Sequence, residues 1–280
     1  MDNGFARTMW RVLEPLHAVT YFSPECVAAH KAVGLRGFWM GYFGARSAPL
    51  GTAGPNLVEA TFYNFHPSMI RRALPDAWTF TTPEAILSAR RTAAASVLRA
   101  VAPDIETAAA TALPALQAAI EAAPAPGRPL FAANRDLPTP TDPVQALWQA
   151  ATTLREHRGD GHVACLLAEG IDGCEAHVLF AALTGSPAII WQANRGWTES
   201  DWAAAQQRLE ARGLLSGDGL TDDGRAVREH IESRTDALAM TAYQGIPDIA
   251  EALTVLTPIS KAVAHSGAVP YPNPMGADPA

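Results

Sequence analysis

The chain has 280 residues, of which 48% are hydrophobic, and it carries a formal net charge of −7 at pH 7. This length and hydrophobic content allow one large domain or two small ones with a sizeable core, and they exclude a collagen-like or wholly disordered chain. The negative charge provides no long-range attraction for the phosphates of a nucleic acid.

Neither a membrane span nor an export signal is expected. Every apolar stretch is interrupted before the length of about 18 residues that a transmembrane helix needs. The segment 1–7 lacks the basic start and apolar block of a signal peptide. Cys26, Cys165 and Cys174 form no CxxC pair, which predicts reduced and buried thiols. The sequence therefore predicts a cytoplasmic protein.

Helical periodicity dominates the chain from its start. In the first half it predicts helices over 5–17, 23–46, 56–66, 83–101 and 104–123. A segment with six prolines follows at 123–143 and is expected to be a loop or linker, because proline blocks helix continuation. The helical pattern returns over 144–157, 161–169, 173–184, 199–213, 221–239 and 247–265. The tail 269–280 holds four prolines and is expected to be extended or loose.

The two halves of the sequence echo each other at a spacing of 116 residues. At this spacing Thr82 matches Thr198, each at the expected start of a helix and each preceded by a tryptophan, Trp78 or Trp197. This predicts two copies of one helix-turn-helix unit, although two alanine-rich amphipathic stretches can also agree by chance. The predicted units span 1–123 and 144–268, with a Pro-rich linker at 124–143 and a loose tail at 269–280.

The most specific pattern lies in the second half. Leu-Glu-Ala-Arg-Gly-Leu at 209–214 is followed, after Ser-Gly-Asp-Gly at 216–219, by Leu-Thr-Asp-Asp-Gly-Arg at 220–225. This pair of motifs resembles the MarR-type winged helix, in which the first motif ends the recognition helix and the second closes the wing. The resemblance covers roughly 160–240 and implies a very short wing, with Asp218-Gly219 as its expected tight turn.

The whole chain resembles a family of actinobacterial proteins described as helix-turn-helix. The segments that carry this resemblance are 15–22, 46–51, 61–67 and 270–274. It implies a mainly α fold of two tandem winged-helix-like units related by internal duplication, and it implies no particular activity.

The charges of the second unit do not favour DNA. A recognition helix places its N-terminal residues on base edges, and here those residues are Glu199, Ser200 and Asp201. Between Arg195 and Asp236 there are six arginines and nine carboxylates. Because a specific binder neutralises several phosphates, strong DNA binding is not expected, whatever the fold.

The first half carries a candidate ligand pocket. Trp39, Tyr42 and Arg46 share one predicted helix face, and His17 and Tyr21 share another. If these faces converge with the end of the helix predicted at 56–66, they form an aromatic pocket with one cation for a carboxylate or phosphate. The full set of predicted ligand-binding residues is His17, Tyr21, Trp39, Tyr42, Arg46, Tyr63, Asn64 and His66.

The same residues have a structural interpretation. Trp39 and Tyr42 then belong to the core, Arg46 pairs with a helix carboxylate, and His66 caps a helix end. Both interpretations stay open at this point.

A second polar group lies in the other half. His162, Glu169, Asp172 and His177 offer two imidazoles and two carboxylates, which could bind zinc or iron or act as an acid–base pair. Their spacing matches no standard metal motif, so exposed or satisfied histidines are the alternative. His17 or His177 could also ligate haem in an aromatic pocket.

Several enzyme signatures are missing: the sequence has no GxxxxGK[ST] loop, no Rossmann GxGxxG and no GxSxG elbow. The sequence therefore predicts a small-molecule-binding protein on a tandem winged-helix scaffold, acting as a sensor or as a repurposed pathway protein. One alternative is a ligand-responsive regulator of MarR type that binds DNA. Another is a pathway enzyme that uses His17, His66 or His177 as an acid, base or metal ligand. A homodimer is a further expected partner.

Overall fold

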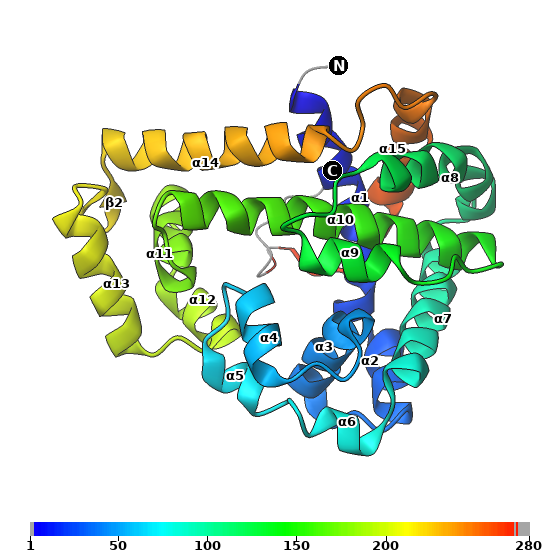
Figure 1. The fold of residues 1–280 in the computed structure, drawn as a ribbon, viewed down its shortest axis with the longest axis horizontal. Helices are drawn as coiled ribbons and strands as arrows, with labels where there is room; N and C mark the ends of the chain where they lie inside the picture. The colour runs from blue at the N-terminus through cyan, green and yellow to red at the C-terminus, as the bar shows by residue number, and fades with distance from the viewer. Residues whose placement is uncertain (1–2, 272, 274–280) are drawn as a thin grey trace.

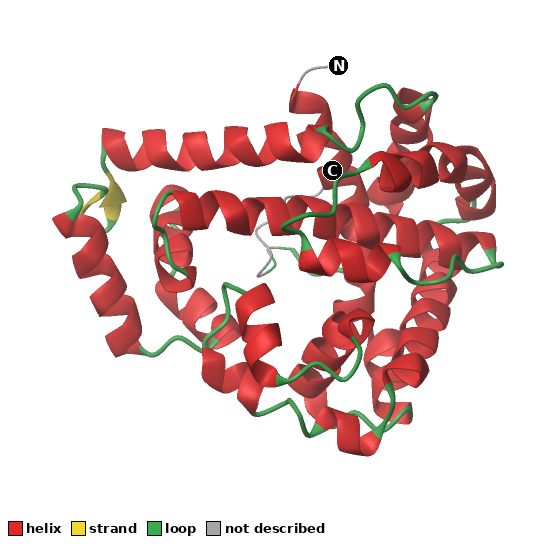
Figure 2. Cartoon of the chain, in the orientation of Figure 1, coloured by secondary structure: helices red, strands yellow, loops and turns green. Residues whose placement is uncertain are grey.

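The computed structural model describes residues 3–271 and residue 273 (Figure 1). Within them the chain is mainly α, as predicted, with fifteen α-helices and a single short hairpin (Figure 2). The first helices are α1 (Asn3–Phe22), α2 (Pro24–Ala32), α3 (Gly37–Ser47), α4 (Pro55–Thr61), α5 (Pro67–Arg71), α6 (Ala77–Phe80), α7 (Pro83–Val101) and α8 (Ile105–Ala122). The others are α9 (Pro129–Arg135), α10 (Pro143–Ala168), α11 (Gly173–Thr184), α12 (Ala188–Arg195), α13 (Glu199–Ala211), α14 (Asp222–Met240) and α15 (Ile249–His265).

Prolines start helices throughout this chain. Six helices, among them α7, α9 and α10, have proline as their first residue, where its missing N–H and fixed φ have no cost. The loop predicted over 124–143 is therefore wrong in part: Pro129 starts α9, whose Leu130 and Phe131 are buried.

The predicted helices are accurate where caps mark them and less so elsewhere. Those at 83–101 and 173–184 have the bounds of α7 and α11. The helix predicted at 23–46 is broken into α2 and α3, because Gly34 has a φ of +103° and lies against the carbonyl of Phe80. Conversely, the patterns at 144–157 and 161–169 belong to the single helix α10.

The largest core lies where α10 crosses the molecule. This helix packs against α1, α7, α8, α9 and α14 (Figure 1). The last helix, α15, packs against α1 and α8 and completes the core. Fully buried Trp148 of α10 shares this core with Leu16 of α1 and Leu256 of α15. The core thus contains residues from both sides of the Pro-rich segment, and the predicted domain boundaries stay a prediction.

A separate core holds the unit with the MarR-like motifs. Here α11–α14 pack around Trp202, Leu209 and Ile231, together with the hairpin of β1 (Leu215–Ser216) and β2 (Gly219–Leu220). The pairs in the antiparallel register are Leu215 with Leu220 and Ser216 with Gly219. The turn is therefore Gly217-Asp218, with φ of +59° at Gly217, and the expected Asp218-Gly219 turn is off by one residue.

The similarity between the two halves is present at the helix starts but absent at the wing. Thr82 and Thr198 are both N-caps whose hydroxyls accept from the backbone N–H three residues later, at 3.3 and 3.1 Å. The hairpin that follows α13 has no counterpart after α7, since only residues 102–104 separate α7 from α8.

Two further expectations concern membranes and the C-terminal tail. In the described part of the chain, no helix combines the length and apolar character needed to cross a bilayer. Of the tail predicted to be loose, Val269 is buried. Residues 272 and 274–280 lie outside the described residues.

Candidate functional site

The start of α13 is the position from which a helix-turn-helix unit reads DNA. Thr198 forms a capping box with Asp201, accepting from the Asp201 N–H while the Asp201 carboxylate accepts from the Thr198 N–H at 2.9 Å. The Asp201 carboxylate therefore serves the helix itself. Apart from Arg208, the exposed residues of α13 are neutral or acidic: Glu199, Ser200, Ala203, Ala204, Gln207, Glu210 and Ala211.

The two arginines at the other end of α13 are exposed, but both are bound to neighbouring segments of the unit. Arg208 donates to Glu175 at 2.7 Å and to Asp172 at 2.6 Å, both at the start of α11. Arg212 donates to the carbonyls of Gly170 and Glu169, both at 2.8 Å. These contacts engage part of each guanidinium, so a phosphate would have to compete with them.

The first half covers the turn that leads into α13. The carbonyl of Asn64 accepts from Trp197 Nε1 at 3.1 Å and from His177 Nε2 at 3.2 Å, and the His66 N–H donates to the carbonyl of Arg195 at 2.8 Å. The His66 ring also packs edge-on against Trp197, with centroids 5.2 Å apart. Figure 1 shows α5 beside the loop between α12 and α13. A DNA duplex approaching this end of α13 would meet the first half.

Comparison with known proteins adds the family. A family model described as a helix-turn-helix family matches residues 6–270. The chain belongs to this helix-turn-helix family. No curated protein and no solved structure matches it. Membership suggests DNA as a partner of the class, because such units commonly place a recognition helix in the major groove.

The predicted pocket residues of this helix-turn-helix protein are divided between two places. The rings of four of them form a chain of contacts. The centroids lie 5.1 Å apart for His17 and Tyr21, 4.7 Å for Tyr21 and Tyr42, and 5.8 Å for Tyr42 and Trp39. The faces of α1 and α3 therefore converge, with Arg46 donating to the Tyr42 hydroxyl at 3.4 Å.

Of the segment after α4, Phe65 joins them through ring contacts with Trp39 and Tyr42, but the three predicted residues do not. The helix predicted over 56–66 ends at Thr61, so Tyr63, Asn64 and His66 lose the expected helical spacing. They face the winged-helix unit instead, where the Tyr63 hydroxyl donates to the carbonyl of Ile171 at 2.6 Å. His66 is the N-cap of α5 and accepts from the Ser68 N–H. These three residues therefore hold the two halves together.

Arg46 already has a carboxylate partner. It forms a bidentate pair with Glu156 of α10, at 2.9 and 3.0 Å, and Glu156 is almost fully buried. Arg155 donates to Glu156 at 3.0 Å and to Glu14 at 3.2 Å, and so links the two carboxylates. Burial alone would raise the pKa of Glu156, but Arg46 and Arg155 outweigh it and hold the pKa well below its usual range.

His17 lies against this charged cluster. Its Nδ1 is 3.0 Å from the Thr152 hydroxyl, and its buried Nε2 has no hydrogen-bond partner among the described residues. Burial, aided by the charge of Arg155, lowers its pKa well below the usual value. The opening beside Tyr21 and Tyr42 has a volume of about 10 Å³, and His17 does not line it. Ligand binding at these residues stays a prediction, and it requires a ligand that displaces Glu156 from Arg46.

The candidate metal ligands of the second half do not meet. His162 Nδ1 lies 3.0 Å from the Thr235 hydroxyl, Glu169 lies 3.4 Å from His230, and His177 bonds to the first half. Across the described residues, no three His, Cys, Asp or Glu side chains are grouped for a metal ion. Burial lowers the pKa of His162 to about 4 and, with the charge of Arg195, that of His177 to about 3.

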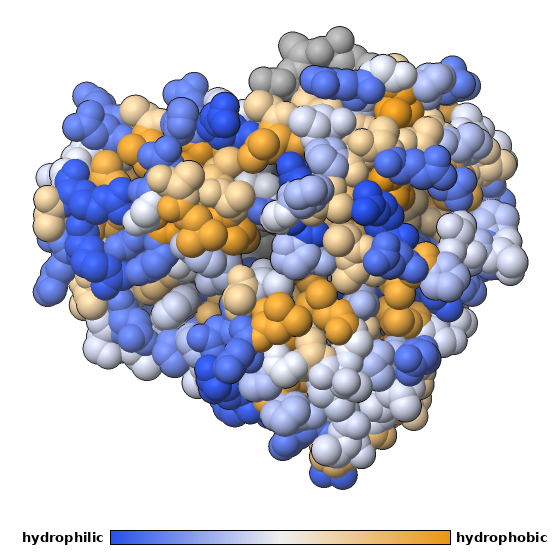
Figure 3. Space-filling view, in the orientation of Figure 1, coloured by the Kyte–Doolittle hydropathy of each residue, from blue (hydrophilic) through white to orange (hydrophobic). Residues whose placement is uncertain are grey.

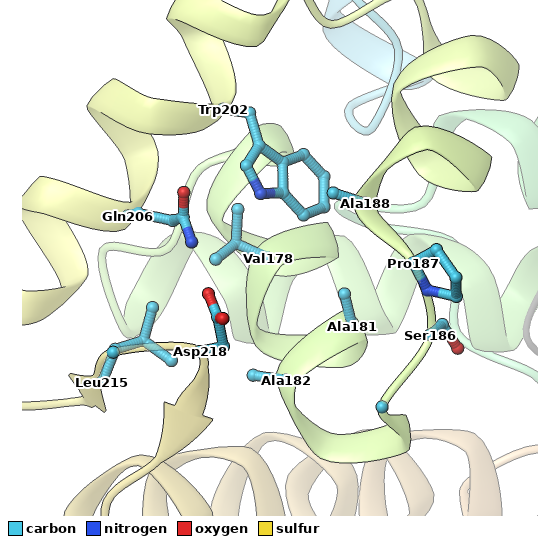
Figure 4. Close-up of a pocket in the computed structure, with 12 residues that line it drawn as sticks. Val178, Ala181, Ala182, Ser186, Pro187, Ala188, Trp202, Gln206, Leu215 and Asp218 are labelled. Carbon is cyan, nitrogen blue, oxygen red and sulfur yellow. The ribbon is translucent and has the colours of Figure 1, made fainter.

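The winged-helix unit contains a cleft that the sequence did not reveal. It has a volume of about 440 Å³, within the range of ligand pockets, and lies between α11, the turn before α12, α13 and the hairpin (Figure 4). Its lining residues are Val178, Ala181, Ala182, Gly185, Ser186, Pro187, Ala188, Trp202, Gln206, Leu215, Gly217 and Asp218. The surface nearby is apolar, with Leu183, Ile189 and Ile190 exposed, and Figure 3 shows hydrophobic surface over α11.

Proposed function

We propose that this protein binds a small molecule and that its winged-helix unit serves as a scaffold for that ligand, in a sensor or a repurposed pathway protein. The observation that carries the proposal is the state of α13. Its two C-terminal arginines donate to the start of α11 and to the segment after α10, and the turn that leads into it is covered by the first half. Its inner face, with Trp202 and Gln206, forms a wall of the cleft.

A second function is favoured by family membership. The helix-turn-helix family, the β1–β2 hairpin after α13 and the MarR-like motifs support a ligand-responsive transcription regulator. In that case α13 must reach a major groove, so the contacts of Asn64 and His66 with the turn before α13 must open. The net charge of −7 opposes this, because every phosphate contact has to overcome long-range repulsion.

DNA binding separates the two functions. Fluorescence anisotropy with DNA from upstream of the protein's own coding sequence, at 50 and 200 mM salt, should give only weak binding without sequence preference. Native mass spectrometry of the protein purified from its own host should show a bound small molecule.

The variant Ser200→Asp tests the role of α13 directly, since Ser200 is exposed at its start, and Ser233→Asp on α14 is the matched control. A specific, salt-dependent complex that Ser200→Asp weakens and Ser233→Asp does not would establish the regulator and overturn the proposal.

A further inference from the structure

The cleft of the winged-helix unit has walls suited to an apolar molecule. Val178 and Ala181 of α11 form one side, and the buried indole of Trp202 on α13 forms another (Figure 4). Leu215 of β1 adds an apolar side chain at the hairpin end. Such walls provide binding energy through burial of apolar surface but no selectivity for charge.

The polar side chains of the cleft are few, and only one of them is charged. Figure 4 shows the Asp218 carboxylate near the Gln206 amide, at the hairpin end. Ser186 is already bonded to the Thr184 hydroxyl at 2.6 Å. None of the ion pairs in the described part of the chain involves Asp218, and the lining contains no arginine, lysine or histidine. The cleft therefore has one uncompensated negative charge at its rim.

We propose that the cleft binds an apolar or aromatic molecule that carries one protonated amine. This inference rests on the proposed function and specifies its ligand class. The apolar part lies against Trp202 and Val178, while the ammonium group lies at Asp218 and a remaining polar group meets Gln206. An anionic ligand of the same shape is repelled by Asp218 without gaining a compensating cation.

Three naphthalene probes of similar shape test this proposal: 2-naphthylmethylamine as the cation, 2-naphthylmethanol as the neutral compound and 2-naphthoate as the anion. Dissociation constants come from saturation-transfer NMR titrations of the full chain at pH 7. We expect the amine to bind roughly fivefold more tightly than the alcohol and the naphthoate to bind least, as a partly exposed ion pair implies.

Variants assign the preference to the cleft. Asp218→Asn should remove the advantage of the amine over the alcohol, whereas Glu210→Gln, an equal charge change on the exposed end of α13, should retain it. Ala182→Phe, which places a ring into the opening from a half-buried position, should abolish binding of all three probes.

The outcomes separate the ligand class from the function. If the alcohol or the naphthoate binds best and Ala182→Phe abolishes that binding, the amine class is wrong and small-molecule binding in the cleft stands. The cleft is not the ligand site if the Ala182→Phe variant binds every probe as tightly as the unaltered protein does. The same holds if neither protein binds any probe. In both cases both proposals fall.

Discussion

Replacing Glu156 with glutamine should destabilise this protein more than replacing its partner Arg46. Glu156 is 1% exposed and accepts two hydrogen bonds from Arg46 and one from Arg155. Glutamine keeps the shape and removes the charge. Arg155 retains Glu14 at 3.2 Å, but Arg46 has no second carboxylate among the described ion pairs. Glu156→Gln thus leaves a buried guanidinium without a counter-charge.

The size of the effect follows from this geometry. Breaking a buried ion pair by removing one partner costs about 3–5 kcal/mol, because the remaining charge stays desolvated. The unfolding entropy of a chain of 280 residues is roughly 0.6 kcal/mol per kelvin. The melting temperature should therefore fall by about 5–8 °C. Arg46→Met should cost less, because Glu156 then keeps Arg155.

Urea denaturation of the single variants and of the double variant Arg46→Met/Glu156→Gln measures the coupling. We expect the double variant to lose about 1–3 kcal/mol less than the two single losses combined. A loss below about 1 kcal/mol for Glu156→Gln would refute this reasoning, since it would mean that Arg46 finds water or another acceptor. Additive losses would likewise show that the pair acts as two independent groups.

Two more predictions concern the contact between the halves and the pH dependence of stability. Gly173→Ala should cost about 1–3 kcal/mol in urea denaturation, because its methyl group would overlap the carbonyl of Tyr63; an unchanged midpoint would show that the halves can move apart freely. Burial, with the charge of Arg128, lowers the pKa of His157 to about 3, so between that value and about 6.5 the unfolded chain binds one proton more and stability falls with falling pH. His157→Phe should therefore reduce the slope of unfolding free energy against pH by about 1.4 kcal/mol per pH unit over pH 4–6. The control variant His265→Phe, at an exposed position, should leave that slope unchanged. Equal slopes in the two variants would contradict a buried neutral imidazole at His157.

Local signals account for what the sequence could predict. The capping threonines Thr82 and Thr198 fix the starts of α7 and α13, and the spacing of Trp39, Tyr42 and Arg46 places them on one face of α3. These features depend only on neighbours within one or two turns of helix. The family comparison, over residues 6–270, agrees with the helix-turn-helix prediction.

Long-range partners account for what it could not predict. Arg46 meets Glu156 across 110 residues, and no periodicity links them. A signal was nevertheless present, since Arg155, Glu156, Arg158 and Asp160 point to several sides of one helix, and any of these charges that is buried must find a partner inside. The cleft was missed because it is made by the α11–α12 turn and the hairpin, whose relative placement is set by tertiary packing.

The properties of α13 connect the two functional interpretations. One helix forms a wall of the cleft through Trp202, meets His66 through Asp201 at 3.9 Å, and is tied to α11 through Arg208. A ligand that binds equally well whether or not the first half covers α13 cannot alter that contact, however tightly it binds. If a ligand that requires a shifted Trp202 weakens the contact with His66, release of the first half must tighten the binding of that ligand by the same factor. Regulation of DNA binding through this cleft thus requires that opening of the contact at residues 64–66 change ligand affinity, whereas a scaffold that only binds its ligand shows no such dependence.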